Sequence, residues 1–251
     1  MRGLRTAVTF LTRVPVGDGG APDLASAVPW FPVVGGLVGA AGGGVHALAW
    51  HWVGPGPAAA VALVVMALLT GAFHHDGLAD IADAFGGGWD RDQRLAILKD
   101  SRHGTYGVMS LVLVVGTQLL SLSPLGPAAG FAGLVAAGAL ARSGAVAMMK
   151  WAPAAQTSGL GADYARGLSV ARVVSGVAAG LFFGGLAMGG WAAVGAAAVL
   201  LASGFTAGLA VRKIGGVSGD VLGAAEVVGE TLVLLVAAAL THRGVAWPWW
   251  R

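Results

Sequence analysis

The sequence predicts an all-α protein, a polytopic transmembrane helical bundle of about seven spans with polar loops on its cytoplasmic side. Hydrophobic residues make up 56% of its 251 residues, and charged residues only 11%. Soluble domains carry about 25% charged residues, so a composition this apolar indicates an integral membrane protein. The 43 glycines agree with that class, because small residues let helices approach one another closely in lipid.

Seven apolar stretches are each long enough to cross a hydrocarbon core of about 30 Å. We expect spans near residues 29–53, 57–85, 104–121, 127–151, 171–189, 191–211 and 225–240, in one integral-membrane domain that covers residues 1–251. In the second stretch the apolar run continues directly into an acidic helix. Residues 1–20 are expected to form a short basic segment at the membrane interface. The absence of cysteine excludes disulfides, thiol catalysis and thiolate metal sites.

Lysine and arginine are distributed unevenly between the two ends of the predicted spans. The joins at 54–56, 122–126 and 189–190 contain neither residue, whereas the alternate segments hold nearly all of them. Because cytoplasmic segments are enriched in Lys and Arg, we expect a multi-pass protein of the inner (cytoplasmic) membrane with its N-terminus inside. The net charge of +3 then reports topology, so the expected partner is the lipid bilayer and no nucleic acid. Arg91 and Arg94 belong to a charge run that predicts only solvation.

Three aspartates, Asp76, Asp80 and Asp83, follow the second apolar run. At 100° per residue they lie within about 60° of one another on a helical face. Carboxylates at a membrane helix end need a partner because their desolvation is costly, and Mg²⁺ is usually held by one or two carboxylates together with substrate phosphates. The spacing therefore indicates a Mg²⁺ site with catalytic acids, and a solvated helix end or a proton relay is the alternative.

A second acidic group, Asp220, Glu226 and Glu230, follows a glycine-rich turn, and two glutamates one turn apart at the start of a membrane span indicate a functional role. On an unbroken helix Glu226 would be rotated about 120° away from Asp220, so Asp220 is interpreted as a loop or helix-cap residue. Arg142 is the one charge deep in its span. We expect it to neutralise either buried carboxylates or a substrate phosphate.

The segment Lys99–Gly107 is dense in hydrogen-bond donors just before a span. Lys99, Ser101 and Arg102 are candidate substrate-binding residues, since cations can clamp a di-anion and Arg can do so bidentately. Backbone N–H groups at the start of the following helix can add to this site. Asp100 is a catalytic candidate, because ordinary positive-inside flanking does not call for an acid.

The candidate groups all fall on the predicted cytoplasmic side. Acids from two distant helix ends, with basic residues between them, suit phosphoryl transfer, in which metal ions and cations neutralise phosphate oxygens. A proton-coupled or metal-ion transporter is the alternative of a different class, but such proteins more often carry ionisable groups near the bilayer midplane. The general base stays open among Asp83, Asp100 and His75.

Five runs of residues share the order and spacing of one family. These runs are Phe10-Leu-Thr-Arg-Val-Pro-Val16, Trp30-Phe-Pro-Val-Val-Gly-Gly-Leu-Val-Gly39, His74-His-Asp-Gly-Leu-Ala-Asp-Ile-Ala-Asp83, Lys99-Asp-Ser-Arg-His-Gly-Thr-Tyr-Gly107 and Gly219-Asp-Val-Leu-Gly-Ala-Ala-Glu226. Over nearly its whole length the chain resembles the adenosylcobinamide-GDP ribazoletransferases, also called cobalamin (5′-phosphate) synthases. The acidic helix also resembles the motif of CDP-alcohol phosphotransferases, so another membrane phosphotransferase is an alternative. This likeness is looser, because Asp80 stands where their motif has arginine.

The resemblance implies an activity in cobalamin biosynthesis. Adenosylcobinamide-GDP would be joined to α-ribazole or its 5′-phosphate with Mg²⁺, and GMP would be released. The 3′-hydroxyl of the ribazole would attack the phosphorus attached to the cobinamide. By the same likeness, the metal and substrate acids are Asp76, Asp80, Asp83, Asp220, Glu226 and Glu230, and the phosphate contacts are Lys99, Arg102 and Arg13. The number of subunits stays open, with a homo-oligomer among the expectations.

Overall fold

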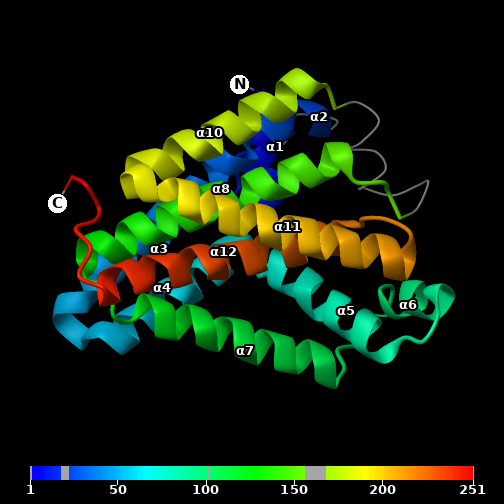
Figure 1. Ribbon diagram of the computed structural model, residues 1–251, viewed down its shortest axis with the longest axis horizontal. Helices are drawn as coiled ribbons and strands as arrows, with labels where there is room; N and C mark the ends of the chain where they lie inside the picture. The colour runs from blue at the N-terminus through cyan, green and yellow to red at the C-terminus, as the bar shows by residue number, and fades with distance from the viewer. Residues whose placement is uncertain (1, 18–22, 101, 156–167, 251) are drawn as a thin grey trace.

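The computed structural model describes residues 2–17, 23–100, 102–155 and 168–250, and these residues form a bundle of helices (Figure 1). The elements are α1 (Arg2–Leu11), α2 (Leu24–Ala27), η1 (Val28–Trp30), α3 (Phe31–Val53), α4 (Pro55–Thr70), α5 (Phe73–Gly87), α6 (Arg91–Ile97), α7 (Thr105–Leu122), α8 (Pro127–Trp151), α10 (Val170–Met188), η2 (Gly189–Trp191), α11 (Ala192–Ile214) and α12 (Gly219–His242). In the described part of the chain the β pairing is confined to one isolated bridge, between Ala154 and Val217. The all-α prediction is confirmed.

Several of these helices can cross a membrane. Within the described residues, five helical stretches are long and apolar enough, or six if the bent pair α4–α5 counts as one span. The longest stretch, Val170–Ile214, has 45 residues, which is about 68 Å of helix and twice a hydrocarbon core. Figure 1 shows α10 and α11 running in opposite directions on either side of η2, so this stretch supplies two apolar helices. The polytopic bundle is confirmed, and the number seven stays a prediction.

Helix α8 forms the centre of the bundle. It packs against α3, α10, α11 and α12. In an apolar stretch of 18 residues, long enough to span a membrane, 83% is buried. Its buried face consists mostly of alanine and glycine, which lets neighbouring helices approach closely. The exception is Arg142, whose side chain is 2% exposed. The central helix therefore carries a guanidinium group into the interior, where it requires anionic partners.

The expected span 57–85 is divided in the structure, because α4 and α5 meet at an angle of 90°. Helix α4 ends at Gly71, whose φ of 66° is left-handed and whose N–H bonds back to the last turn. This is the usual role of glycine after a helix. Ala72 also has a positive φ, 55°, which is rare for a residue with a Cβ. The side chain of Arg13 packs over Gly71, and its backbone N–H donates to the carbonyl of Leu69. The N-terminal segment therefore covers the bend.

Two arginines of α6 hold the polar connections together at one end of the bundle. Arg91 donates to the carbonyls of Ile214 and Ala155 at 3.0 and 3.1 Å, and Arg94 donates to the carbonyl of Lys213 at 3.2 Å. Cations stabilise the carbonyl end of a helix, and α11 ends at Ile214. The prediction that Arg91 and Arg94 are merely solvated is therefore wrong, because both side chains cross to other segments that sequence spacing does not reveal.

Candidate active site

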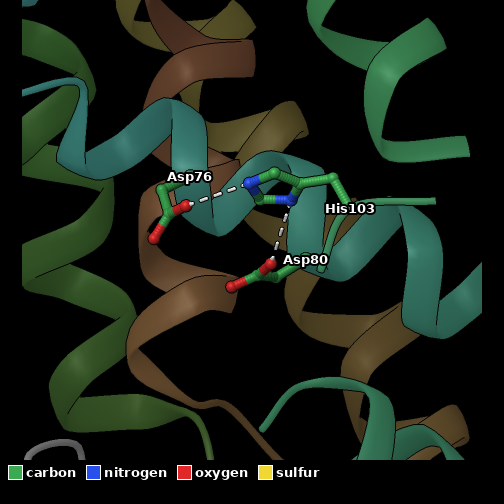
Figure 2. Close-up of side chains that lie close together, drawn as sticks. All are labelled: Asp76, Asp80 and His103. Atoms are coloured by element: carbon green, nitrogen blue, oxygen red, sulfur yellow. Dashed lines mark ion pairs between the residues drawn. The ribbon is translucent and has the colours of Figure 1, made fainter. Parts of the chain in front are cut away.

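Two carboxylates and an imidazole form a cluster at the side of α5. Asp76 and Asp80 lie one turn apart on α5, and His103 lies in the segment before α7 (Figure 2). The His103 Nε2 is 3.6 Å from Asp76 Oδ1, and its Nδ1 is 3.6 Å from Asp80 Oδ1. The side chain of Asp76 is 64% exposed and that of Asp80 17%. The cluster is therefore open to ligands on the Asp76 side.

Asp83 holds the segment that carries His103 against α5. Its Oδ2 accepts the Gly104 N–H at 2.6 Å and its Oδ1 accepts the Gly107 N–H at 2.9 Å. The residue is 8% exposed, and a carboxylate in this position satisfies unpaired N–H groups at the N-terminus of α7. Each of these oxygens keeps a second acceptor site, so Asp83 anchors this segment and stays a candidate metal ligand or general base.

Replacement of Asp83 with alanine is expected to release this segment. Two N–H groups would lose their acceptor, and a buried unsatisfied donor costs about 1–3 kcal/mol. Hydrogen–deuterium exchange should therefore become faster at the amides of Gly104 and Gly107. In an Asp92→Ala control, which removes a side chain that is 95% exposed, exchange at these amides should stay as in the wild type. Unchanged exchange in Asp83→Ala would show that the anchor is not needed.

Asp220 joins the cluster from the far part of the chain. It lies in the first turn of α12, two residues after the N-cap Ser218, so it belongs to the helix and not to a loop or cap as predicted. A Cβ on Gly77 would lie 3.0 Å from the Cα of Asp220, so α5 and α12 approach closely because Gly77 has no side chain. The Asp220 carboxylate thereby interacts electrostatically with Asp76 and Asp80.

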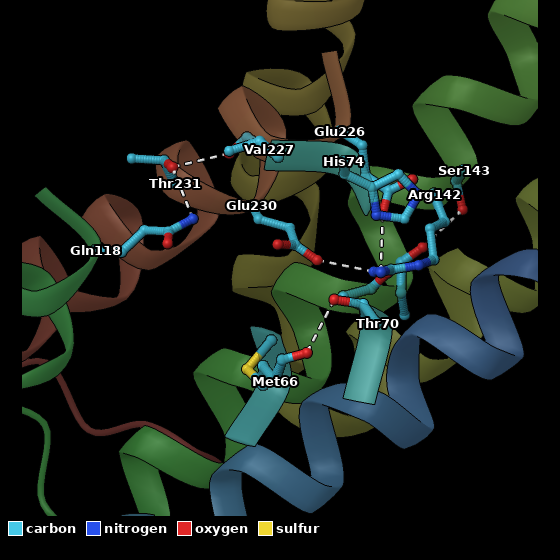
Figure 3. Close-up of polar contacts among 12 residues, drawn as sticks. Met66, Thr70, His74, Gln118, Arg142, Ser143, Glu226, Val227, Glu230 and Thr231 are labelled. Atoms are coloured by element: carbon cyan, nitrogen blue, oxygen red, sulfur yellow. Dashed lines mark hydrogen bonds and ion pairs between the residues drawn. The ribbon is translucent and has the colours of Figure 1, made fainter. Parts of the chain in front are cut away.

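Glu226 and Glu230 face a different, buried site. Glu226 Oε1 is 2.8 Å from Arg142 Nη2 and 3.0 Å from His74 Nδ1, and Glu230 Oε1 is 2.8 Å from Arg142 Nη1 (Figure 3). Because α12 runs unbroken from Asp220, rotations of about 120° to Glu226 and about 80° to Glu230 carry the glutamates away from the cluster. Of the two partners that the sequence left open for Arg142, the structure supplies the buried carboxylates.

The predicted substrate-binding residues are spread over three places. Arg102 makes a bidentate ion pair with Asp100, with Nη2 2.6 Å from Oδ2, and hydrogen bonds from Arg102 lower the pKa of the Asp100 carboxyl to about 2. Lys99 is exposed in the same segment, whereas Ser101 lies outside the described residues. Arg13 is at the bend between α4 and α5. Arg142 lies in the buried site with Glu226 and Glu230.

His103 is the site residue that sequence reasoning missed. In the sequence, its position within the donor-rich run Lys99–Gly107 was the available signal for a site residue. In the structure, His103 directly precedes Gly104, whose N–H donates to Asp83. The second missed contact is His74, which pairs with Glu226 in the buried site. Both depend on the packing of separate segments.

Comparison with known proteins decides the family. The family model described as cobalamin-5-phosphate synthase matches residues 3–238. The chain belongs to this family. Relatives named adenosylcobinamide-GDP ribazoletransferase include those of Bradyrhizobium diazoefficiens (42% identity, 94% of this chain and 93% of the relative), Ralstonia nicotianae (41%, 96% and 96%) and Chlorobium phaeobacteroides (38%, 93% and 96%). No solved structure matches the chain. The chain is thus a transferase of cobalamin synthesis, as the resemblance implied.

The exposed cluster suits a divalent cation. One ligand atom from each of Asp76, Asp80 and His103 lies within 4.8 Å of the others. Mg²⁺ keeps several waters and is bound through one or two carboxylates together with substrate phosphates. Asp76 and Asp80 provide two such carboxylates beside open solution, and Asp220 adds negative charge. In contrast, the carboxylates of Glu226 and Glu230 are already paired with Arg142.

Proposed function

We propose that this protein joins adenosylcobinamide-GDP to α-ribazole, or to α-ribazole 5′-phosphate, and releases GMP in a Mg²⁺-dependent reaction. The observation that carries the proposal is the open cluster of Asp76, Asp80 and His103, with Asp220 beside it. A diphosphate needs this concentration of cation-binding groups at a place that a water-soluble nucleotide can reach. The names of the relatives support adenosylcobinamide-GDP as one of the substrates.

The reaction exchanges a phosphoanhydride bond for a phosphoester bond. The 3′-hydroxyl of the ribazole attacks the phosphorus attached to the cobinamide, its proton passes to a base, and the bond to the GMP phosphate breaks. Mg²⁺ supplies neutralisation of the phosphate oxygens when it is bound. Asp76 and Asp80 would hold it, and Lys99 and Arg102 would bind the phosphate of GMP as it leaves.

Of the three candidates for the general base, His75 has the fewest constraints. Both oxygens of Asp83 accept backbone N–H groups. Asp100, with a pKa of about 2, is a weak base at neutral pH, since an efficient base has a pKa near the operating pH. His75 adjoins Asp76 on α5 and is half-buried. We therefore assign proton removal from the ribazole hydroxyl to His75.

The activity is tested with the full chain in phospholipid nanodiscs. Adenosylcobinamide-GDP, α-ribazole and Mg²⁺ should give a corrinoid product and GMP in equal amounts, and a chelator of divalent cations should stop both. Re-addition of Mg²⁺ should restore them. Formation of product at the same rate in the chelator would overturn the metal dependence, and the absence of GMP under all conditions would overturn the proposed function.

We also propose that the cluster faces the cytoplasm. The chain contains no cysteine, so a single introduced cysteine can be labelled without background. A cysteine at Gly87, the end of α5, should react with a membrane-impermeant maleimide only after the inner face is exposed. A cysteine at Ser123, between α7 and α8, should react in intact cells. The reverse pattern would contradict this orientation.

A further inference from the structure

A largely apolar cavity lies behind the acidic cluster. It has a volume of about 380 Å³, is lined by residues of α4, α5, α7, α8 and α12, and opens to the surface beside the exposed Val64 and Val115. This volume falls within the range of about 300–1,000 Å³ that is common for small-ligand sites. Its walls are aliphatic side chains such as Ala67 of α4 and Leu111 of α7, and three polar residues, His75, Gln118 and Glu230, interrupt them.

The polar residues of the cavity can recognise a hydrogen-bond acceptor. Gln118 is 3% exposed, and its Nε2 donates to Thr231 Oγ1 at 3.1 Å. His75 lines the same cavity. A primary amide has two N–H donors and one carbonyl oxygen, so a donor remains for a ligand. Figure 3 shows Glu230 between the Gln118–Thr231 pair and Arg142. The ion pair with Arg142 holds the Glu230 carboxylate in place.

The cavity and the acidic cluster share helix α5. His75 lines the cavity, and the next residue, Asp76, belongs to the cluster. Consecutive helical residues project about 100° apart, so α5 presents one face to each site. The cavity also reaches Ala72, at the bend that begins α5. A ligand that fills the cavity therefore has its end at His75 next to Asp76, one of the two carboxylates that would hold the divalent cation.

Resting on the proposed function, we infer that this cavity binds the base of the acceptor nucleoside. Ribazole is the riboside of a dimethylbenzimidazole, a flat bicyclic base that is apolar except for one unsubstituted ring nitrogen. The aliphatic walls take the methylated ring, and Gln118 donates to the ring nitrogen. The ribose then lies at His75, with its 3′-hydroxyl towards Asp76. A purine base, with several polar edge atoms, would leave most of them unpaired in the same cavity, which is costly.

Filling the cavity tests this assignment. Ala67→Phe places a ring in the cavity, and Val61→Phe on the same helix is the matched control, because Val61 is 45% exposed and does not line the cavity. In nanodiscs, Ala67→Phe should raise KM for α-ribazole by at least about tenfold and leave KM for adenosylcobinamide-GDP within about twofold. Val61→Phe should leave both constants unchanged.

Gln118→Leu removes the proposed donor while preserving the apolar packing. It should raise KM for α-ribazole by about tenfold, the scale of one lost hydrogen bond. If Ala67→Phe is aggregated on gel filtration, Gln118→Leu alone tests whether the cavity binds the base. Equilibrium dialysis with α-ribazole alone provides a readout that does not need turnover, and both variants should bind it more weakly than the wild type.

The outcomes separate this inference from the proposed function. If the wild type binds ribazole and releases GMP while both variants keep its KM, the cavity does not hold the base, and the proposed function stands. A lipid acyl chain would then be its occupant. If the wild type neither binds ribazole nor releases GMP, both proposals are overturned. Selectively weaker binding of ribazole by both variants would establish the cavity as the site of the base.

Discussion

Asp76→Asn and Asp80→Asn are each expected to lower kcat/KM for GMP release by at least about a hundredfold, the scale on which removal of one electrostatic stabiliser acts. Each substitution keeps the shape of the side chain and removes one negative charge from the cation site. The exposed position of Asp76 makes a folding defect small, because its side chain is 64% exposed. The rate is measured with both substrates in nanodiscs at saturating Mg²⁺.

The matched control for these variants is Asp92→Asn. Asp92 lies on α6 with a side chain that is 95% exposed, so the same change of charge is made outside the cluster. Its kcat/KM should equal that of the wild type. Gel filtration and thermal unfolding show whether each variant is folded. A folded Asp76→Asn or Asp80→Asn protein with the rate of the control would remove the cluster from the chemistry.

Arg142→Met is expected to destabilise the protein by about 3–5 kcal/mol, the usual cost of leaving a buried charge without its partner. Glu226 and Glu230 would both lose the guanidinium group that lies 2.8 Å from each of them. Thermal unfolding of the detergent-solubilised protein measures the loss. Arg243→Met is the control, because Arg243 is exposed after the end of α12, and its unfolding temperature should not change.

A compensating variant distinguishes charge from packing. Arg142→Met combined with Glu226→Gln and Glu230→Gln removes the guanidinium and both buried carboxylates together, so it should recover most of the lost stability. Residues of one network are strongly non-additive in this way. If the triple variant were less stable than Arg142→Met, the destabilisation would come from lost packing, and the account of the buried network would be wrong.

The sequence predicted the fold where apolar composition decides it, and failed where local backbone chemistry does. The apolar runs correctly predicted membrane-length helices, since each run has to be hydrogen-bonded within itself in lipid. The division of the expected span 57–85 was missed because the run stays apolar through the bend. Gly71 was the available signal, as glycine commonly ends helices.

The site could be predicted as far as helical periodicity extends. The spacing of Asp76 and Asp80 correctly placed them side by side on α5. His103 comes from 23 residues beyond Asp80, and its position depends on the hydrogen bonds of Asp83 to the start of α7. Spacing likewise could not show that α12 turns Asp220 towards the cluster and Glu226 towards Arg142, since this depends on which helices pack against it.

Binding of Mn²⁺, a paramagnetic substitute for Mg²⁺, tests the central claim that Asp76 and Asp80 hold the divalent cation. Mn²⁺ alone is titrated into the protein in nanodiscs, and the free ion is followed by its electron paramagnetic resonance signal. The wild type and Asp92→Asn should bind Mn²⁺ in a manner that Mg²⁺ competes for, and the Asp76→Asn/Asp80→Asn double variant should not. Binding of Mn²⁺ by that double variant with the wild-type affinity would contradict the account.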